Sequence, residues 1–265
     1  MKKLLITNEV NYHYEIIPSI IKYHQKIINK ECQIYLYLKH PNESFLKIIF
    51  EMFKNLNEGH LYETYDYYIN LNKNYYQDII HKSNIFYISH NVEEEHPQIY
   101  HLTPLSKQFI TCDVLPFANQ KIKVNKPIFI IQGNICGSRR LFNQLEELLK
   151  IERNFTFKII GKFRKKYQHP TFFNNPKINL KINLNFEEFH KEFLDCYAIL
   201  PLVNEEHQPK YFKSKLTSSI NYGKAYNLKF LIDKKLNDIY KLNGFTYQTP
   251  IEFKQQFIKL LDSFN

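Results

Sequence analysis

Apolar and polar residues alternate along the chain in two series of strand-length runs and amphipathic helical stretches. In the first series, strands are expected at residues 3–7, 33–38 and 85–89, and helices at 16–27 and 44–53. The helices follow from apolar residues that recur every three or four positions. Residues 59–72 are rich in tyrosine and fit neither period. Strands that alternate with helices in this way favour a parallel sheet covered by helices.

The second series follows a connection at residues 104–126. Its expected strands are 127–132, 155–160, 197–203 and 228–232. Its expected helices begin at Ser138, after the cap Asn185, at Ser214 with a stop at Gly223, and after the cap Thr249. The sequence therefore predicts an α/β protein of two Rossmann-like domains, residues 1–120 and 121–265, whose parallel sheets face a central cleft.

Length and composition exclude several classes of protein. The chain has 265 residues, of which 44% are hydrophobic, with 22 Phe and 20 Tyr, so intrinsic disorder is excluded. No apolar run approaches the roughly 18 residues of a membrane helix, and the start turns polar too early for a signal peptide. The four cysteines have no metal-ligand spacing, so we expect reduced thiols and a cytoplasmic protein.

The formal charge of +10 is concentrated in the second half of the chain. Residues 1–120 hold 11 Lys and Arg against 13 Asp and Glu, whereas residues 121–265 hold 25 against 13. A coding bias of an AT-rich genome would enrich lysine in both halves. The asymmetry indicates an anionic partner for the second half, with nucleic acid, a nucleotide phosphate and a membrane surface all open.

One candidate anion site joins a strand to a helix at residues 133–140. Gly133 allows close approach of the backbone to a ligand, Asn134 follows it, and a helix N-terminus offers free N–H groups. Arg139 and Arg140 in a first helical turn oppose the helix dipole, a conflict that a bound phosphate would remove. The alternative is a flexible turn with two solvated arginines.

A second candidate lies at residues 213–224. Thr217, Ser218 and Ser219 are poor residues for a helix interior, and Lys215 precedes them. At a helix start, their hydroxyls and the free N–H groups converge on a diphosphate. The alternative is an ordinary capped helix with a serine-rich entry.

Two of the eleven histidines follow strands of the first series. His13 comes after the first strand and His90 directly after residues 85–89, so both would face the crevice at the carboxyl ends of a parallel sheet. Histidine is the natural general base near neutral pH, although either residue can equally be structural. The chain has no Asp-x-Asp, so no metal is indicated. The basic run Lys162–Lys166 is a contact for nucleic acid or a solvated loop.

Together these residues resemble the donor-binding domain of GT-B-fold glycosyltransferases. The matching landmarks are a strand into Gly133-Asn134 with basic residues after it, a strand that ends at Gly161-Lys162, the segment Pro201-Leu202-Val203, and Lys215 to Ser219 leading to Gly223. The order of elements matches across about 140 residues. One departure is that retaining members carry two glutamates spaced by seven, and Ser218 stands at the second of these positions, which leaves the stereochemistry open.

The resemblance implies a nucleotide-sugar donor of the UDP or GDP type, no cofactor, and a glycan, protein or lipid acceptor. It implies that Arg139, Arg140 and Lys215 hold the donor diphosphate together with Thr217, Ser218 and Ser219. The nucleoside would lie near Gly161 and Lys162, His90 would face the sugar, and the last helix would pack back on the first domain. Two other functions stay open: a basic nucleic-acid-binding protein, and an inactive scaffold of the same fold.

Overall fold

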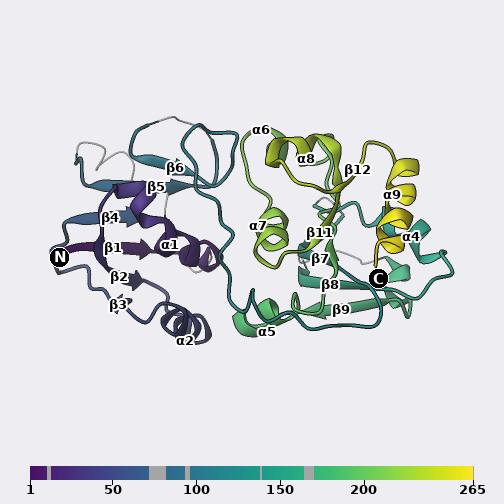
Figure 1. Cartoon of the computed structure of the whole chain (residues 1–265), viewed down its shortest axis with the longest axis horizontal. Helices are drawn as coiled ribbons and strands as arrows, with labels where there is room; N and C mark the ends of the chain where they lie inside the picture. Colours follow the sequence, from purple (N-terminus) through teal and green to yellow (C-terminus); the bar gives the residue numbers. More distant parts are fainter. Residues whose placement is uncertain (11–12, 72–81, 93–95, 138, 164–169, 265) are drawn as a thin grey trace. The chain divides into compact units, whose positions relative to one another are not determined.

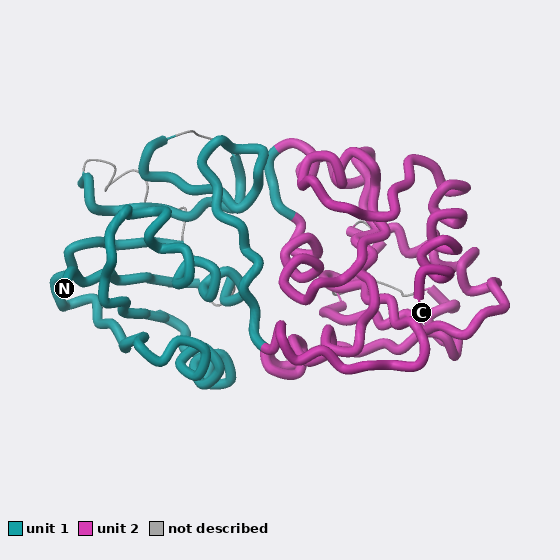
Figure 2. Tube along the Cα trace, in the orientation of Figure 1, with its two compact units in different colours: residues 1–116, 214–216 teal, residues 117–213, 217–265 magenta. Residues whose placement is uncertain are grey.

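The computed structural model describes residues 1–10, 13–71, 82–92, 96–137, 139–163 and 170–264. Contacts divide the chain into two compact units, each shown in its own colour in Figure 2. Unit 1 is Met1–Pro116 with Ser214–Leu216, and unit 2 is Phe117–Lys213 with Thr217–Asn265. Each unit contains one six-stranded sheet with flanking helices, and every strand pairing is parallel. The predicted α/β class with two parallel sheets is confirmed.

The sheet of unit 1 has the spatial order β3-β2-β1-β4-β5-β6 (Figure 1). Its strands are β1 (Lys2–Asn8), β2 (Cys32–Leu38), β3 (Asn57–Glu58), β4 (Tyr67–Asn70), β5 (Ile85–Ser89) and β6 (Ile99–His101). Its helical elements are η1 (Tyr14–Ile16), α1 (Ile17–Ile28) and α2 (Glu43–Met52). Both α-helices bury the apolar stripe that their sequence spacing predicts.

The sheet of unit 2 has the spatial order β12-β11-β10-β7-β8-β9. Its strands are β7 (Ile128–Ile135), β8 (Thr156–Phe163), β9 (Ile178–Ile182), β10 (Ala198–Ile199), β11 (Lys229–Asp233) and β12 (Phe245–Tyr247). Its helical elements are α4 (Asn143–Leu149), η3 (Thr171–Asn174), α5 (Phe186–Lys191), α6 (Lys210–Lys213), α7 (Ser218–Ala225), α8 (Lys234–Tyr240) and α9 (Pro250–Asp262).

The core of unit 2 is built on phenylalanine rings from three parts of its sequence. Phe129 of β7 lies 4.8 Å from Phe257 of α9, and Phe155 lies 5.3 Å from the same ring, measured between ring centroids. Phe253 and Leu260 of α9 are buried in the same cluster. The apolar face of the last helix is therefore covered within unit 2, and its packing on the first domain stays a prediction.

The helix after β7 begins later than the sequence predicts. The sequence predicts that this helix opens at Ser138, which lies outside the described residues, with the two arginines in its first turn. Instead α4 starts at Asn143, and Arg139 and Arg140 lie in the connection before it. Leu141 precedes the helix as well, and its backbone N–H donates to Leu202 O at 2.9 Å. The arginines therefore do not oppose a helix dipole.

The carboxyl ends of the strands position the candidate residues. Parallel strands end at the same edge of a sheet, where ligands of such folds bind. In unit 1 this edge leads from β1 toward His13 and from β5 into His90. In unit 2 it leads from β7 and β8 into the two glycine-containing segments. No helix among the described residues is long and apolar enough to cross a membrane.

Candidate functional site

Two glycines lie side by side near the carboxyl ends of β7 and β8. Gly133 and Gly161 are register partners, with φ angles of +120° and +152° that other residues rarely adopt. A Cβ atom on Gly161 would lie 1.8 Å from the Gly133 carbonyl oxygen, and one on Gly133 would lie 2.7 Å from Nη2 of Arg140. Both positions therefore require glycine, and the edge of the sheet presents main chain without side chains.

Arg140 lies behind these glycines and is only 5% exposed. Its Nε and Nη2 donate to the carbonyl oxygen of Gln132 at 3.3 and 2.9 Å, and Nη1 donates to Arg139 O at 3.2 Å. The guanidinium also hydrogen-bonds the side chain of Tyr211, and burial lowers its pKa. Within the described part of the chain it forms no ion pair, so a buried positive charge stands here without a carboxylate.

Gln132 connects the arginine to the start of α7. Its side-chain Nε2 donates to the hydroxyls of Ser218 and Ser219 at 3.0 and 2.9 Å, while its main-chain oxygen accepts from Arg140. Gln132 itself is 3% exposed. Gln132 thus connects the two candidate anion sites, residues 133–140 and residues 213–224.

Thr217 is the N-cap of α7 but its hydroxyl caps nothing. The residue is 1% exposed, and its Oγ1 is buried without a hydrogen-bond partner among the described residues. A buried hydroxyl without a partner is costly, which makes a ligand atom at this position favourable. The first N–H groups of a helix are also free and favour a negative charge. The two features together suit an anionic ligand at the N-terminus of α7.

The remaining predicted residues of unit 2 lie at the same edge but are more exposed. Asn134 and Lys162 are register partners at the ends of β7 and β8, and both side chains are exposed. Arg139 is half-buried, and its backbone N–H donates to Cys136 O at 3.0 Å. Of the basic run Lys162–Lys166, residues 164–166 lie outside the described part of the chain.

Lys215 belongs to unit 1, whereas the predicted arginines belong to unit 2. It forms an antiparallel bridge with Asn91, and Val92 N donates to Ser214 O at 2.8 Å. Residues 214–216 therefore belong to unit 1, whereas Thr217, Ser218 and Ser219 belong to unit 2. The predicted set of three diphosphate-binding cations is found as two arginines in unit 2 and one lysine beside His90.

His13 and His90 come together at the carboxyl edge of unit 1. Their rings stack with centroids 3.7 Å apart at an angle of 28°, and His13 Nδ1 lies 3.6 Å from a carboxylate oxygen of Glu15. Burial, with smaller contributions from His13 and Lys215, lowers the pKa of His90 to about 3. Its Nε2 is buried without a partner among the described residues. His90 is therefore a neutral hydrogen-bonding group at neutral pH, and His13, which has a carboxylate beside it, is the better candidate base.

Three residues of these sites were not identified from the sequence. Gln132 was recognisable in the sequence as a candidate, because it is the polar residue that ends an apolar run. Glu15 lies two residues after His13, a spacing that by itself indicates no contact between the two side chains. The contact depends on the left-handed backbone at His13, whose φ is 69°. Tyr211 lies in a segment without any motif, and only the fold brings it to Arg140.

Comparison with known proteins gives a structural likeness without a sequence match. No protein-family model and no curated protein matches the sequence. AviGT4, a glycosyltransferase involved in avilamycin A biosynthesis, is similar with a TM-score of 0.60 and 7% identity, over 98% of this chain and 93% of that one. Anabaena Alr3699/HepE in complex with UDP and glucose gives 0.57 and 8%, over 97% and 89%.

A glycosyltransferase from Rickettsia africae gives the same picture, with a TM-score of 0.55 and 10% identity over 98% of this chain and 88% of that one. The likeness extends over nearly the whole chain in all three cases. The two six-stranded parallel sheets with their flanking helices match GT-B-fold structures. At these identities the likeness establishes the fold, and the activity is a separate question.

Proposed function

We propose that this GT-B-fold protein is a glycosyltransferase that moves a sugar from a nucleoside diphosphate sugar, of the UDP or GDP type, to an acceptor hydroxyl. The observation that carries the proposal is the buried, unpartnered hydroxyl of Thr217 at the start of α7. Gln132 connects that helix start to the buried guanidinium of Arg140, which has no carboxylate among its described partners. The bound UDP and glucose of HepE support the choice of donor class.

Residues 121–265 form the donor side in this proposal. The diphosphate sits at the N-terminus of α7, where Thr217 donates its hydroxyl hydrogen and the first N–H groups of the helix donate theirs. Arg139 and Arg140 supply positive charge, and Ser218 and Ser219 are held in place by Gln132. The leaving diphosphate gains charge as the bond from its oxygen to the anomeric carbon breaks. Fixed donors and cations stabilise that charge in the transition state without a metal.

Residues 1–120, with Lys215, form the acceptor side. The acceptor is a hydroxyl of a glycan, protein or lipid. As its oxygen bonds to the anomeric carbon, the hydroxyl proton passes to the imidazole of His13, and Glu15 stabilises the imidazolium that results. His90, which stays neutral, offers its buried Nε2 to a sugar or acceptor hydroxyl. In this division of roles, unit 2 stabilises the negative charge of the leaving diphosphate, and unit 1 accepts the proton of the acceptor hydroxyl.

The test is thermal unfolding of the pure protein with UDP, GDP, CMP, ADP and TDP, with short DNA as a comparison, at low and high salt. A nucleotide at about 100 times its dissociation constant adds roughly 2.7 kcal/mol of stability. The proposal predicts a selective shift with one nucleoside diphosphate that survives in high salt. A shift with DNA alone that salt abolishes would replace it with nucleic-acid binding. No shift with any nucleotide would favour an inactive scaffold.

A further inference from the structure

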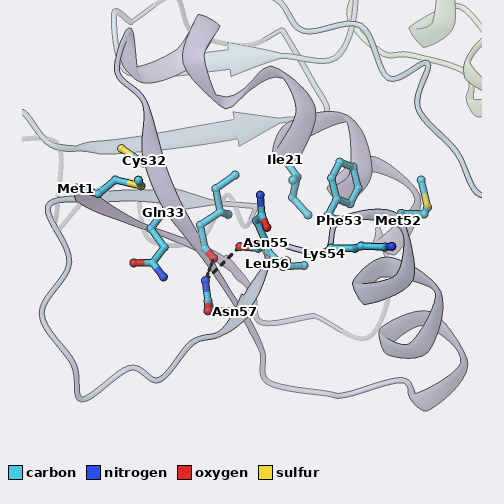
Figure 3. Close-up of a pocket in the computed structure, with 11 residues that line it drawn as sticks. Met1, Ile21, Cys32, Gln33, Met52, Phe53, Lys54, Asn55, Leu56 and Asn57 are labelled. Carbon is cyan, nitrogen blue, oxygen red and sulfur yellow. Dashed lines mark hydrogen bonds between the residues drawn. The ribbon is translucent and has the colours of Figure 1, made fainter.

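A cavity of about 800 Å³ lies at the amino-terminal edge of the sheet of unit 1 (Figure 3). It is lined by the starts of β1 and β2 and by the loop between α2 and β3. His13 and His90 follow the opposite ends of the strands. Since β1 and β2 each have seven residues, about 20 Å of strand separates the two edges. The cavity is therefore distinct from the site proposed for catalysis.

Side-chain amides dominate the polar lining. Gln33, Asn55 and Asn57 all line the cavity. Asn57 Nδ2 donates to the main-chain oxygens of Ile34 and Asn55, both at 3.2 Å, and this fixes the amide with its oxygen at the far end from them (Figure 3). The side chains of Gln33 and Asn55 form no hydrogen bond within the described residues. An amide both donates and accepts, as a hydroxyl does, so this lining suits a ligand that carries hydroxyls.

The lining carries little charge. It contains no carboxylate, and its one basic side chain, Lys54, is exposed. Burial raises the pKa of the Cys32 thiol, so the thiol is protonated and neutral at physiological pH. The two cations of the lining, the Lys54 side chain and the amino group of Met1, are both solvent-exposed and would bind an anion only weakly, and a cationic ligand would meet no carboxylate. The cavity favours a neutral ligand.

Apolar side chains form the remaining wall. Phe53 and Met52, at the end of α2, and Ile21 of α1 line the cavity together with the amides. A sugar ring combines hydroxyls at its edge with an apolar C–H face, and so uses both kinds of lining. A volume of about 800 Å³ lies within the roughly 300–1,000 Å³ of small-molecule sites and exceeds what a single ring fills.

We propose that this cavity binds a short neutral oligosaccharide, at a site separate from catalysis. The proposal does not depend on transferase activity, because the cavity and its lining belong to the other edge of the sheet. If the protein transfers sugars, this site holds a remote part of a glycan and raises its local concentration.

Cys32 provides a direct readout of occupancy. It is half-exposed in the cavity, whereas Cys112, Cys136 and Cys196 are buried. Alkylation by iodoacetamide at mildly alkaline pH is followed by mass spectrometry with lactose, cellobiose, maltotriose or chitotriose present, and Cys32→Ser identifies the modified peptide. A sugar at about ten times its dissociation constant should slow alkylation about tenfold, because only the free fraction reacts.

Two variants test whether the protection of Cys32 from alkylation depends on the amides that line the cavity. Gln33→Ala and Asn55→Ala each remove an amide without removing a hydrogen bond of the free protein, and should reduce protection to less than about threefold at the same sugar concentration. Gln25→Ala removes an exposed amide of α1 outside the cavity and should leave protection unchanged. Glucose 6-phosphate serves as the charged comparison.

Three results would overturn the proposal: no protection by any neutral sugar, protection by glucose 6-phosphate alone, or protection that both amide variants retain in full. Each of them leaves the nucleotide shift of the proposed donor site untouched. The failure of this inference is therefore distinguishable from the failure of the proposed function.

Discussion

The two sheets have the same parallel architecture, but their carboxyl edges present different chemistry. In unit 2 the edge consists of main chain at Gly133 and Gly161, a buried guanidinium and the unpartnered Thr217 hydroxyl. In unit 1 the edge presents two stacked imidazoles with a carboxylate beside one of them. The first arrangement offers hydrogen-bond donors and positive charge, and the second can accept a proton. The same fold thus presents two different sets of chemical groups through a few residues at its strand ends.

The largest expected effect is on stability and comes from replacing Gly161, at the contact of β8 with β7, by alanine. Gly161→Ala would place Cβ 1.8 Å from the Gly133 carbonyl oxygen, at a φ of +152°. We expect a loss of at least about 4 kcal/mol in the free energy of unfolding, because backbone strain and a clash with main chain combine. Urea unfolding followed by circular dichroism measures it. Gly133→Ala, whose Cβ would meet only the end of the Arg140 side chain, is the control and should cost less; equal costs would contradict the account.

The next largest effect is on turnover, and it distinguishes the role of His13 from that of His90. His13→Asn removes the proposed base, and asparagine tolerates the left-handed φ of 69° at this position. Turnover of donor sugar with acceptor should fall by roughly 10²–10⁴, as general-base removal does, with the KM for the donor unchanged. His207→Gln changes an exposed histidine that contacts Asn204 and should leave turnover unaltered. Full activity of His13→Asn would remove this residue from the mechanism.

A smaller effect is expected at the buried arginine. Arg140→Met keeps the length of the side chain and removes the donors to Gln132 O. The unfolding free energy should fall by about 1–3 kcal/mol, the cost of leaving a buried carbonyl without its partner, and UDP affinity should fall as well. Arg153→Met, at an exposed arginine paired with Asp262, should change stability by less than about 0.5 kcal/mol. A neutral result at Arg140 would show that its burial has no energetic role.

Each unit also contains a histidine that folding keeps neutral. Burial lowers the pKa of His90 in unit 1 and of His190 in unit 2 to about 3. In the unfolded chain both take up a proton below about pH 6.5, whereas the folded chain excludes it. The stability from these groups is therefore complete above about pH 6.5 and is lost progressively as the pH falls toward 3.

His190→Gln and His90→Gln should each flatten this acid dependence. The slope of unfolding free energy against pH should fall by up to about 1.4 kcal/mol per pH unit for His190, and by less for His90, which is partly exposed. Urea unfolding at several acidic pH values measures the slopes. His207→Gln, an exposed histidine, should leave the slope unchanged. An unaltered slope in His190→Gln would mean that this imidazole is charged in the folded protein.

Much of the fold was predictable because strand and helix periods are local. The expected strand at 33–38 is β2 (Cys32–Leu38), and the expected cap Asn185 accepts from Glu188 N at 2.9 Å in a complete capping box. The strands β3, β4, β6, β9 and β12 were missed, since none of them contains an apolar run of more than three residues and their register is set by a neighbouring strand. Helix α7 begins at Ser218 instead of Ser214 and passes Gly223, because Lys215 bridges to Asn91, Ser214 O accepts from Val92 N, and the glycine packs against Phe230.

The candidate site was predictable only where a single segment of the sequence contains a recognisable pattern of residues. Glycines at strand ends and hydroxyls at a helix start are visible in the sequence, and the residues proposed from them lie where the strands of unit 2 end. The contact of Gln132 with Ser218, 86 residues apart in the sequence, depends on strand order. So do the stacking of His13 on His90 and the placement of Lys215 in unit 1. No local pattern contains that information.

The most direct test of the central claim is an equilibrium titration of UDP and GDP against the wild-type protein, Thr217→Val and Thr249→Val. Thr249 caps α9 through Glu252 N at 3.2 Å, so its valine variant should lose about 1 kcal/mol of stability and keep its nucleotide affinity. Thr217→Val removes a hydroxyl that has no partner, so it should unfold like the wild type and bind the nucleotide about tenfold more weakly. Equal affinity in Thr217→Val and the wild type, or no binding of either nucleotide, would contradict the account.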